Sequence, residues 1–395
     1  MIILFNEKKN CCGCGACENI CPKKAISMKE DEYGFIYPEI NHNLCIECHL
    51  CEKVCHFQSR SNYSKDHMAY AAVTKNQEIL MNSTSGGIFT TLALEFIKDG
   101  GYVSGSIYDG DFNVVHIVSN KIEDVYKMQG SKYVQSSIND AYLQIKKLLL
   151  QKEKVLFSGT PCQVDGLYGF LQRDYDNLYT IDIVCHGVPN NKMFKDYLNY
   201  ETKKYGKITE IKFRDKTQGW GTKGSIKFEN KKKIIYSGTS EYYYLFNKSL
   251  TFRDSCYKCK YSSHHRPANI TIGDYWGIEK MDFQLLNKKE IDIDKGISLI
   301  ICNNEQGNDF LEKYKFNFNI YLTTLDNVSK FNHNLNQPSI LPSKRNKILN
   351  MYGKSFDFVA ADIACDLKKE KYKFMIKKIV PSKMKIIIKR FLKKG

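Results

Sequence analysis

The spacing of apolar residues predicts alternating strands and helices over most of the chain. Apolar side chains recur at helical spacing from residue 88 to residue 97, and Gly100-Gly101 ends that helix. The next two segments, 102–108 and 114–119, flank a glycine turn and predict a β-hairpin. The other expected strands are 69–73, 155–157, 178–184, 211–214, 225–228, 269–273 and 296–302, and the other expected helices are 138–152, 162–171 and 308–314. This alternation predicts the α/β class.

Residues 155–184 follow the order strand, helix, strand, which predicts a parallel βαβ unit. Ligands of such units lie beyond the carboxyl ends of the strands. Cys162 begins the helix of this unit and Cys185 follows its second strand. Both cysteines therefore fall where a ligand is expected.

The first 55 residues contain the same four-cysteine run twice. In each run three cysteines stand three residues apart and a fourth follows after three further residues, which is the spacing of bacterial ferredoxins. The fourth cysteine of each run points away from its own loop and therefore ligates the other cluster. We assign one 4Fe-4S cluster to Cys11, Cys14, Cys17 and Cys55 and a second to Cys45, Cys48, Cys51 and Cys21, which leaves Cys12 over.

A zinc module is the alternative for this region, because Cys-x2-Cys pairs also hold zinc. Zinc sites use spaced pairs, however, and need neither three consecutive steps of this kind nor the fourth cysteine. His56 stands after Cys55 where the first run has proline, and this departure removes no ligand. Residues 34–38 are expected to form a strand between the two halves.

Four cysteines outside the repeated run are candidates for a third site. They are Cys162, Cys185, Cys256 and Cys259. A third 4Fe-4S cluster, a zinc site of Cys256 and Cys259 with His264 or His265, and plain buried cysteines all fit this spacing. The two ferredoxin clusters need an exit for electrons, which favours the third cluster. Cys302 and Cys365 are expected in the core.

Length and composition indicate a globular protein with further domains. The chain has 395 residues, of which 43% are hydrophobic and 26% charged. Met1–Phe5 is too short for the apolar part of a secretory signal, and cysteines at cluster spacing need a reducing compartment, so we expect a cytoplasmic protein.

The net charge of +16 is concentrated at the C-terminus. Residues 368–395 contain twelve Lys or Arg and one Glu. Nucleic-acid enzymes carry such charge on the folded body, so no nucleic-acid partner is expected. An apolar helix face follows in this tail, formed by Met384, Ile387, Ile388, Phe391 and Leu392. It suits peripheral contact with an anionic membrane, and a solvated tail is the alternative.

Two short segments resemble nucleotide-binding turns. Ser85-Gly86-Gly87 opens a helix, whose N–H groups suit a phosphate, although plain N-capping explains the same residues. The turn Gly130–Tyr133 combines small residues with a cation and an aromatic ring, and is either a nucleotide contact or an ordinary surface turn.

Together with residues 158–163, Cys185-His186-Gly187, the Cys256 and Cys259 pair and Gly273–Gly277, these segments resemble the beta subunit of coenzyme F420 hydrogenase and dehydrogenase. The resemblance covers about residues 1 to 300. It implies FAD beside a 4Fe-4S cluster, with electrons passing between clusters and an organic hydride carrier. The implied flavin contacts are Ser85, Gly86, Gly87, Gly130, Ser131, Lys132, Tyr133, Gly159 and Thr160, and the four late cysteines would hold the proximal cluster.

The resemblance also implies a domain order. We expect a small α+β bacterial-type ferredoxin domain at 1–58, then a larger mixed α/β flavin and iron-sulfur domain. The N-terminal part of that domain would occupy 67–150 and its C-terminal part 151–330, with an extension at 331–395.

The predicted function is that of an iron-sulfur flavoprotein oxidoreductase. Electrons would pass from a redox donor such as ferredoxin through three clusters to FAD and an unidentified organic acceptor, or in the reverse direction. His186 and Asp274 are candidate proton donors, or residues that orient a neighbour. The alternative is a subunit that only relays electrons to a partner enzyme, for which polysaccharide biosynthesis is one setting.

Overall fold

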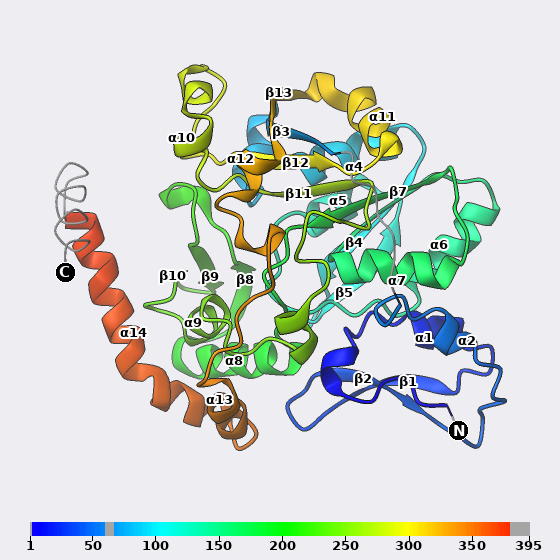
Figure 1. The fold of residues 1–395 in the computed structure, drawn as a ribbon. Coiled ribbons are helices and arrows are strands. Elements are labelled where there is room, and N and C mark those ends of the chain that lie inside the picture. Colours follow the sequence, from blue (N-terminus) through cyan, green and yellow to red (C-terminus); the bar gives the residue numbers. More distant parts are fainter. Residues whose placement is uncertain (1, 60–66, 380–395) are drawn as a thin grey trace.

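The computed structural model describes residues 2–59 and 67–379 (Figure 1). Residues 2–59 form a small unit at the edge of the molecule. Its elements are η1 (Lys8–Asn10), α1 (Ala16–Ile20), β1 (Ile26–Glu30), β2 (Ile36–Ile40) and α2 (Leu50–Lys53). The two strands pair antiparallel, with Ile26 opposite Ile40. The strand expected at 34–38 therefore begins two residues later, because Gly34, at φ +85°, belongs to the turn.

One eight-stranded mixed sheet forms the centre of the molecule. Its strands are β3 (Met68–Thr74), β4 (Tyr102–Tyr108), β5 (Val114–Ser119), β6 (Val155–Gly159), β7 (Leu178–Ile183), β11 (Ile270–Asp274), β12 (Ser298–Cys302) and β13 (Phe318–Thr323). They lie in the order β13-β3-β12-β11-β7-β6-β4-β5. Neighbours from β11 to β4 run parallel and the outer pairs antiparallel, so the predicted βαβ unit lies in the parallel centre.

Helices cover both faces of this sheet. They are α3 (Gln77–Asn82), α4 (Ile88–Lys98), α5 (Ile122–Met128), α6 (Ala141–Leu150), α7 (Pro161–Leu171), α10 (Ile278–Met281), α11 (Glu305–Tyr314) and α12 (Leu325–Ser329). Successive residues of β6 point to opposite faces. Leu156 therefore packs with α4, α5 and α11, whereas Phe157 packs with α6 and α7.

A second layer is built on a three-stranded antiparallel sheet. It contains α8 (Asn191–Tyr205), β8 (Ile208–Lys212), β9 (Gly224–Phe228), β10 (Lys232–Ile235), α9 (Glu241–Asn247), α13 (Arg345–Tyr352) and α14 (Phe356–Ile379). The remaining elements of the chain are short 3₁₀ helices: η2 (Lys216–Gln218), η3 (Asp254–Lys258), η4 (Phe283–Asn287), η5 (Lys315–Asn317) and η6 (His333–Leu335). Aromatic side chains fill its core, and Phe194, Phe213 and Tyr242 contact one another there.

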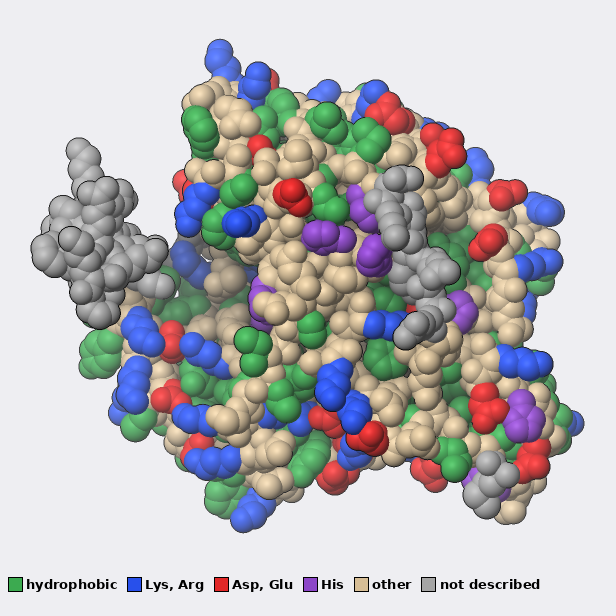
Figure 2. Space-filling model, in the orientation of Figure 1, with side chains coloured by type: hydrophobic (Ala, Val, Ile, Leu, Met, Phe, Trp, Pro, Cys, Tyr) green, Lys and Arg blue, Asp and Glu red, His purple; other side chains and the backbone are tan. Residues whose placement is uncertain are grey.

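The C-terminal helix α14 reaches beyond the second layer (Figure 1). Val359 and Ile363 face the core, whereas Tyr372, Met375 and Ile376 are exposed. Lys and Arg side chains gather along this edge (Figure 2). The tail helix expected from Met384 to Leu392 lies outside the described residues.

The mixed α/β class with a small N-terminal ferredoxin-like unit is confirmed, but details differ. The edge strand β13 was not expected, since only one of its residues is fully buried and the apolar pattern is weak. Cys302 lies in the core as expected. The expectation for Cys365 is wrong: it is exposed because α14 turns Ile363 and Leu367 inward and places Cys365 on the outer face.

Two further expectations can be set against the fold. The boundary at residues 150 and 151 falls between α6 and β6 of one continuous sheet, and the four domain limits remain predictions. Among the helices of the described residues, none has the length and apolar character needed to cross a bilayer.

Candidate iron-sulfur and flavin site

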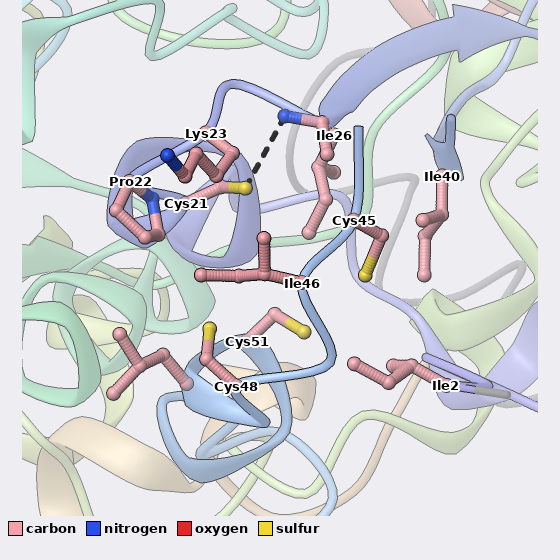
Figure 3. A pocket seen from close by; sticks show the side chains of 12 residues that line it. Ile2, Cys21, Pro22, Lys23, Ile26, Ile40, Cys45, Ile46, Cys48 and Cys51 are labelled. Atoms are coloured by element: carbon pink, nitrogen blue, oxygen red, sulfur yellow. Dashed lines mark hydrogen bonds between the residues drawn. The ribbon is translucent and has the colours of Figure 1, made fainter. Parts of the chain in front are cut away.

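The eight cysteines of the repeated run gather around two cavities. Cys21 lines one cavity together with the second run, from which Cys45, Cys48 and Cys51 project (Figure 3). The other cavity brings Cys55 to the first run and is lined by Cys11, Cys12, Cys14, Cys17, Cys51 and Cys55. The structure thus exchanges the fourth cysteine between the runs in the way the spacing predicts. Because Cys51 lines both cavities, the two sites adjoin.

The loop around the cavity of Cys11, Cys14, Cys17 and Cys55 has the geometry that cluster binding needs. Gly13 and Gly15 have φ of +69° and +75°, which lets the chain wrap tightly. A backbone N–H also reaches sulfur at the cavity of Cys21, Cys45, Cys48 and Cys51, where Ala25 N donates to Cys21 Sγ at 3.3 Å. None of the fifteen cysteines, all of which lie in the described residues, forms a disulfide. The eight cysteines and the two cavities fit 4Fe-4S clusters, which take cysteine thiolates as ligands.

Helix α7 holds the small unit against the central sheet. A Cβ added at Gly166 would lie 2.8 Å from Cys14 Sγ, and one added at Gly169 would lie 2.3 Å from the carbonyl oxygen of Val54. These two glycines therefore let the cluster loop and its C-terminal end approach the helix directly.

His56 makes a polar contact between the small N-terminal unit and α7. Its Nδ1 lies 3.0 Å from Oδ1 of Asp165, a fully buried carboxylate on α7. Tyr261 donates to the other carboxylate oxygen at 2.6 Å, and Lys260 donates to backbone oxygens of His56 and Ser59. The departure of His56 from the ferredoxin pattern thus has a structural role in docking.

The four late cysteines come together from three segments. Cys162 lies in the first turn of α7, Cys185 comes two residues after β7, Cys256 lies in η3 and Cys259 follows η3. Burial raises the pKa of Cys185 to about 12, and the nearby thiols of Cys162 and Cys259 add to the rise. Burial also raises the pKa of Cys256, and the other three thiols add to that rise. The structure therefore brings these four cysteines together, and the third cluster remains a prediction.

The positions of His264 and His265 do not favour the alternative of a zinc site with Cys256 and Cys259. His264 is engaged through Nε2 with Asn336 Oδ1 at 3.2 Å, and His265 is exposed. Among the described residues, no three His, Cys, Asp or Glu side chains are close enough to hold one metal ion. Ligands of a cubane bind separate irons, so that criterion does not apply to a cluster.

His186 lies between the late cysteines and the second layer. Its Nδ1 is 3.1 Å from Asn334 Oδ1, and its Nε2 is 3.3 Å from Ser249 Oγ. Burial lowers its pKa. The ring meets the edge of Phe246 at 5.5 Å, and Phe246 stacks on Tyr133 at 4.2 Å with an interplanar angle of 3°.

The structure brings the two expected flavin segments into contact. Thr84 Oγ1 lies 2.9 Å from Ser131 Oγ and accepts from Ser131 N at 2.9 Å. Ser85 Oγ, however, donates to Ile297 O, and Gly86 N donates to Ser298 Oγ. The Ser85 hydroxyl and the Gly86 amide are therefore already hydrogen-bonded, to the residue before β12 and to the first residue of β12. Gly87, at φ +81°, is the N-cap of α4.

Two other expected contacts, Lys132 and Thr160, have clear local roles. Lys132 Nζ donates to Met128 O at 3.1 Å and lies near the carbonyls that end α5, and burial lowers its pKa to about 7. Thr160 is the N-cap of α7 and forms a capping box with Gln163, directly after Gly159. The flavin role of each residue remains a prediction.

Asp274 belongs to an ion pair that the sequence did not reveal. Arg214 donates to its two oxygens at 2.7 and 3.1 Å, and Trp220 Nε1 donates at 2.9 Å. Arg214 also reaches Tyr133 OH at 3.5 Å. Although burial acts against it, Asp274 raises the pKa of Arg214. Because Arg214 and Trp220 occupy both carboxylate oxygens, the contacts favour the orienting role, and the catalytic role of Asp274 remains a prediction.

Lys216 is a second residue that sequence reasoning missed. Its Nζ donates to Leu80 O and Ser85 O, both at 2.6 Å, and fixes the loop before α4. Burial lowers its pKa to about 7. The sequence signal for this residue is the charged stretch Arg214-Asp215-Lys216 before the glycine-containing segment 218–221.

Comparisons with known proteins match both parts of the chain. Residues 10–59 match a 4Fe-4S dicluster domain, and residues 152–328 match the C terminus of the coenzyme F420 hydrogenase/dehydrogenase beta subunit. An uncharacterized protein of Methanocaldococcus jannaschii is 23% identical over 82% of this chain and 91% of its own length. Coenzyme F420-dependent sulfite reductase of the same organism is 26% identical over 45% of this chain, and the match spans only 28% of that enzyme.

A solved structure was also found. A chain of the F420-reducing [NiFe] hydrogenase complex from Methanosarcina barkeri aligns with a TM-score of 0.45 and 17% identity, covering 75% of this chain and 95% of that one.

The fold, the cysteine cavities and the domain matches define an iron-sulfur redox protein with a 4Fe-4S dicluster domain. Its residues 152–328 match the C terminus of the coenzyme F420 hydrogenase/dehydrogenase beta subunit, which confirms the resemblance that the sequence motifs indicated.

Proposed function

We propose that the chain is an iron-sulfur flavoprotein oxidoreductase that moves electrons between 4Fe-4S clusters and FAD. The observation that carries this proposal is a continuous series of cysteines. It begins with the group around Cys21, continues with the group around Cys11 and ends with Cys162, Cys185, Cys256 and Cys259. Cys51 lines both ferredoxin cavities, and Cys14 lies against α7, whose first turn carries Cys162.

The protein also provides a connection from the late cysteines toward the expected flavin segments. His186 follows Cys185 directly, contacts Phe246 and through it Tyr133. Two buried polar atoms near Tyr133 and Lys132 lack a hydrogen-bond partner within the described residues, Arg214 Nε and Tyr108 OH. Buried polar atoms are normally paired, so these atoms support a polar ligand at this position.

A bound flavin would supply the exchange between two-electron hydride chemistry and one-electron clusters. The roles of the chain's own residues follow from their contacts. Arg214 is held in one orientation by Asp274, Lys216 fixes the loop before α4, and Thr84 joins that loop to Ser131. The organic acceptor, the redox donor and the membrane contact of residues 368–395 remain predictions.

The test is the cofactor content of the anaerobically reconstituted full chain. The proposal requires about twelve irons, four for each of three clusters, and one FAD per chain. A matched Cys256→Ser variant is expected to lose about four of these irons while the two ferredoxin clusters stay. A wild-type chain with about eight irons and no flavin would refute the proposal.

A further inference from the structure

Arg253 is a fully buried cation that no carboxylate of the protein neutralises. The other buried arginines are Arg214, Arg266 and Arg345, and each forms an ion pair with an aspartate at 2.7 or 2.8 Å. Within residues 2–59 and 67–379, no Asp or Glu forms such a pair with Arg253. Because an unpaired buried charge is costly, buried charges are normally paired. The guanidinium group therefore needs a different anionic partner.

The side chain of Arg253 is directed at the cysteine loop of the N-terminal unit. Its Nε donates to Cys11 O at 2.8 Å, and its Nη2 donates to Cys11 Sγ at 3.7 Å. Its Nη1 donates to Oε1 of the buried Gln135 at 3.3 Å, and the guanidinium carbon lies 4.0 Å from the centre of the Tyr37 ring. The positive charge thus lies beside one sulfur of the group assigned to the Cys11 cluster, which consists of Cys11, Cys14, Cys17 and Cys55.

Gly13 leaves the space that this approach requires. Its φ is +69°, and a Cβ added there would lie 2.9 Å from Arg253 Nη1 and 2.8 Å from Gln135 Nε2. Gly15, in the same loop at φ +75°, has its nearest such neighbour at 3.6 Å. Both glycines suit a left-handed backbone, but only Gly13 is also needed for the contact with Arg253.

The backbone of Arg253 is held by the main body of the protein. Its N–H donates to Val188 O at 3.0 Å, and its carbonyl oxygen accepts from Cys256 N at 2.9 Å. Arg345 donates to the preceding carbonyl, that of Phe252, at 2.8 and 3.2 Å. The cation is therefore fixed in position from outside the ferredoxin loop and is not free to follow movements of that loop.

We propose that Arg253 is the fixed counter-charge of the Cys11 cluster and that it raises the reduction potential of this cluster. Four thiolate ligands make a 4Fe-4S cluster anionic, and reduction adds one more negative charge. A buried cation at a fixed position consequently stabilises the reduced cluster more than the oxidised one. The hydrogen bond to the Cys11 sulfur acts in the same direction, because bonds to cluster sulfurs are among the features that set the potential.

The inference goes beyond the proposed function and fails separately from it. It needs only the Cys11 cluster, and neither the third cluster nor FAD. A wild-type chain with about eight irons and no flavin would refute the proposed function but would leave the test of Arg253 intact.

The test is the reduction potential of the Cys11 cluster in the anaerobically reconstituted full chain. Redox titrations followed by electron paramagnetic resonance would report each cluster, and iron content would be measured on the same samples. Arg253→Met removes the charge and should shift the potential of the Cys11 cluster downward. Arg253→Lys keeps the charge but loses the forked contact, and should give a smaller downward shift. The internal reference is the cluster to which Arg253 makes no hydrogen bond in the described residues, formed by Cys21, Cys45, Cys48 and Cys51, and it should shift least.

A matched pair of glycine variants tests the same contact without replacing Arg253. Gly13→Ala and Gly15→Ala both strain a left-handed position, but only Gly13→Ala displaces the guanidinium group. The potential of the Cys11 cluster should therefore be lower in Gly13→Ala than in Gly15→Ala.

Three results would overturn the inference. The first is an unchanged potential in Arg253→Met at full iron content. The second is an equal shift in Arg253→Met and Arg253→Lys, because that would indicate an effect of packing and not of charge. The third is loss of iron from both Arg253 variants together with equal potentials in the two glycine variants, which would give Arg253 a structural role alone.

Discussion

Replacing Gly166 by alanine tests the direct contact between the first cluster loop and α7. The added methyl group would lie 2.8 Å from both Cβ and Sγ of Cys14 and 3.1 Å from Tyr142 OH. Carbon atoms in contact prefer about 3.5–4.0 Å, so the loop or the helix must move by roughly 1 Å. Overpacking of this kind costs about 1–3 kcal/mol, whereas the better helix propensity of alanine returns about 1 kcal/mol.

We therefore expect Gly166→Ala to lose up to about 2 kcal/mol of stability and to disturb the first cluster selectively. Gly169→Ala should be worse, because the obstructing atom is the Val54 carbonyl oxygen at 2.3 Å and cannot rotate away. Gly110→Ala is the matched control, since nothing lies within 4 Å of its Cβ position. The measurements are the apparent unfolding midpoint, the iron content and the electron paramagnetic resonance spectrum of each cluster. A Gly166→Ala protein identical to Gly110→Ala in all three would refute the docking geometry.

Three other changes test separate contacts. His56→Ala leaves the buried carboxylate of Asp165 without one partner, so we expect a loss of about 1–3 kcal/mol by chemical unfolding, and His56→Ala as stable as wild type would contradict this role. Arg214→Lys keeps the charge but loses the two-point contact with Asp274, and should lower FAD content after reconstitution, whereas full flavin occupancy would argue against a flavin site here. Burial lowers the pKa of Lys216 to about 7, so between that pH and its unfolded pKa near 10.5 only the unfolded chain holds the proton, and stability should rise with pH. Lys216→Met should flatten this rise, and an unchanged slope would show that Lys216 is not its source.

Local chemistry made the cysteines predictable. The spacing of the repeated run already implies the exchange of Cys21 and Cys55, because a fixed number of residues sets which way each cysteine points. The positions of Cys162 and Cys185 were predictable from the strands before them, because the carboxyl ends of parallel strands meet at one edge of a sheet.

Long-range contacts could not be predicted in this way. Arg214 and Asp274 are 60 residues apart, and their pairing depends on how the second layer packs on the sheet. The same holds for His56 and Asp165, 109 residues apart, where the sequence showed only a departure from the ferredoxin pattern. Ser85 remains a predicted flavin contact, but the hydrogen bond of its hydroxyl to Ile297 O could not be predicted, because the two residues are 212 positions apart.

In the proposed function, electrons reach the flavin through the late cysteines. The most direct test is the rate of flavin reduction when an FAD-loaded chain is mixed anaerobically with a one-electron donor such as reduced ferredoxin, comparing wild type with Cys256→Ser. We predict rapid reduction of both ferredoxin clusters in the two proteins, and reduction of the flavin in wild type alone. Flavin reduction at the wild-type rate in Cys256→Ser would contradict this route.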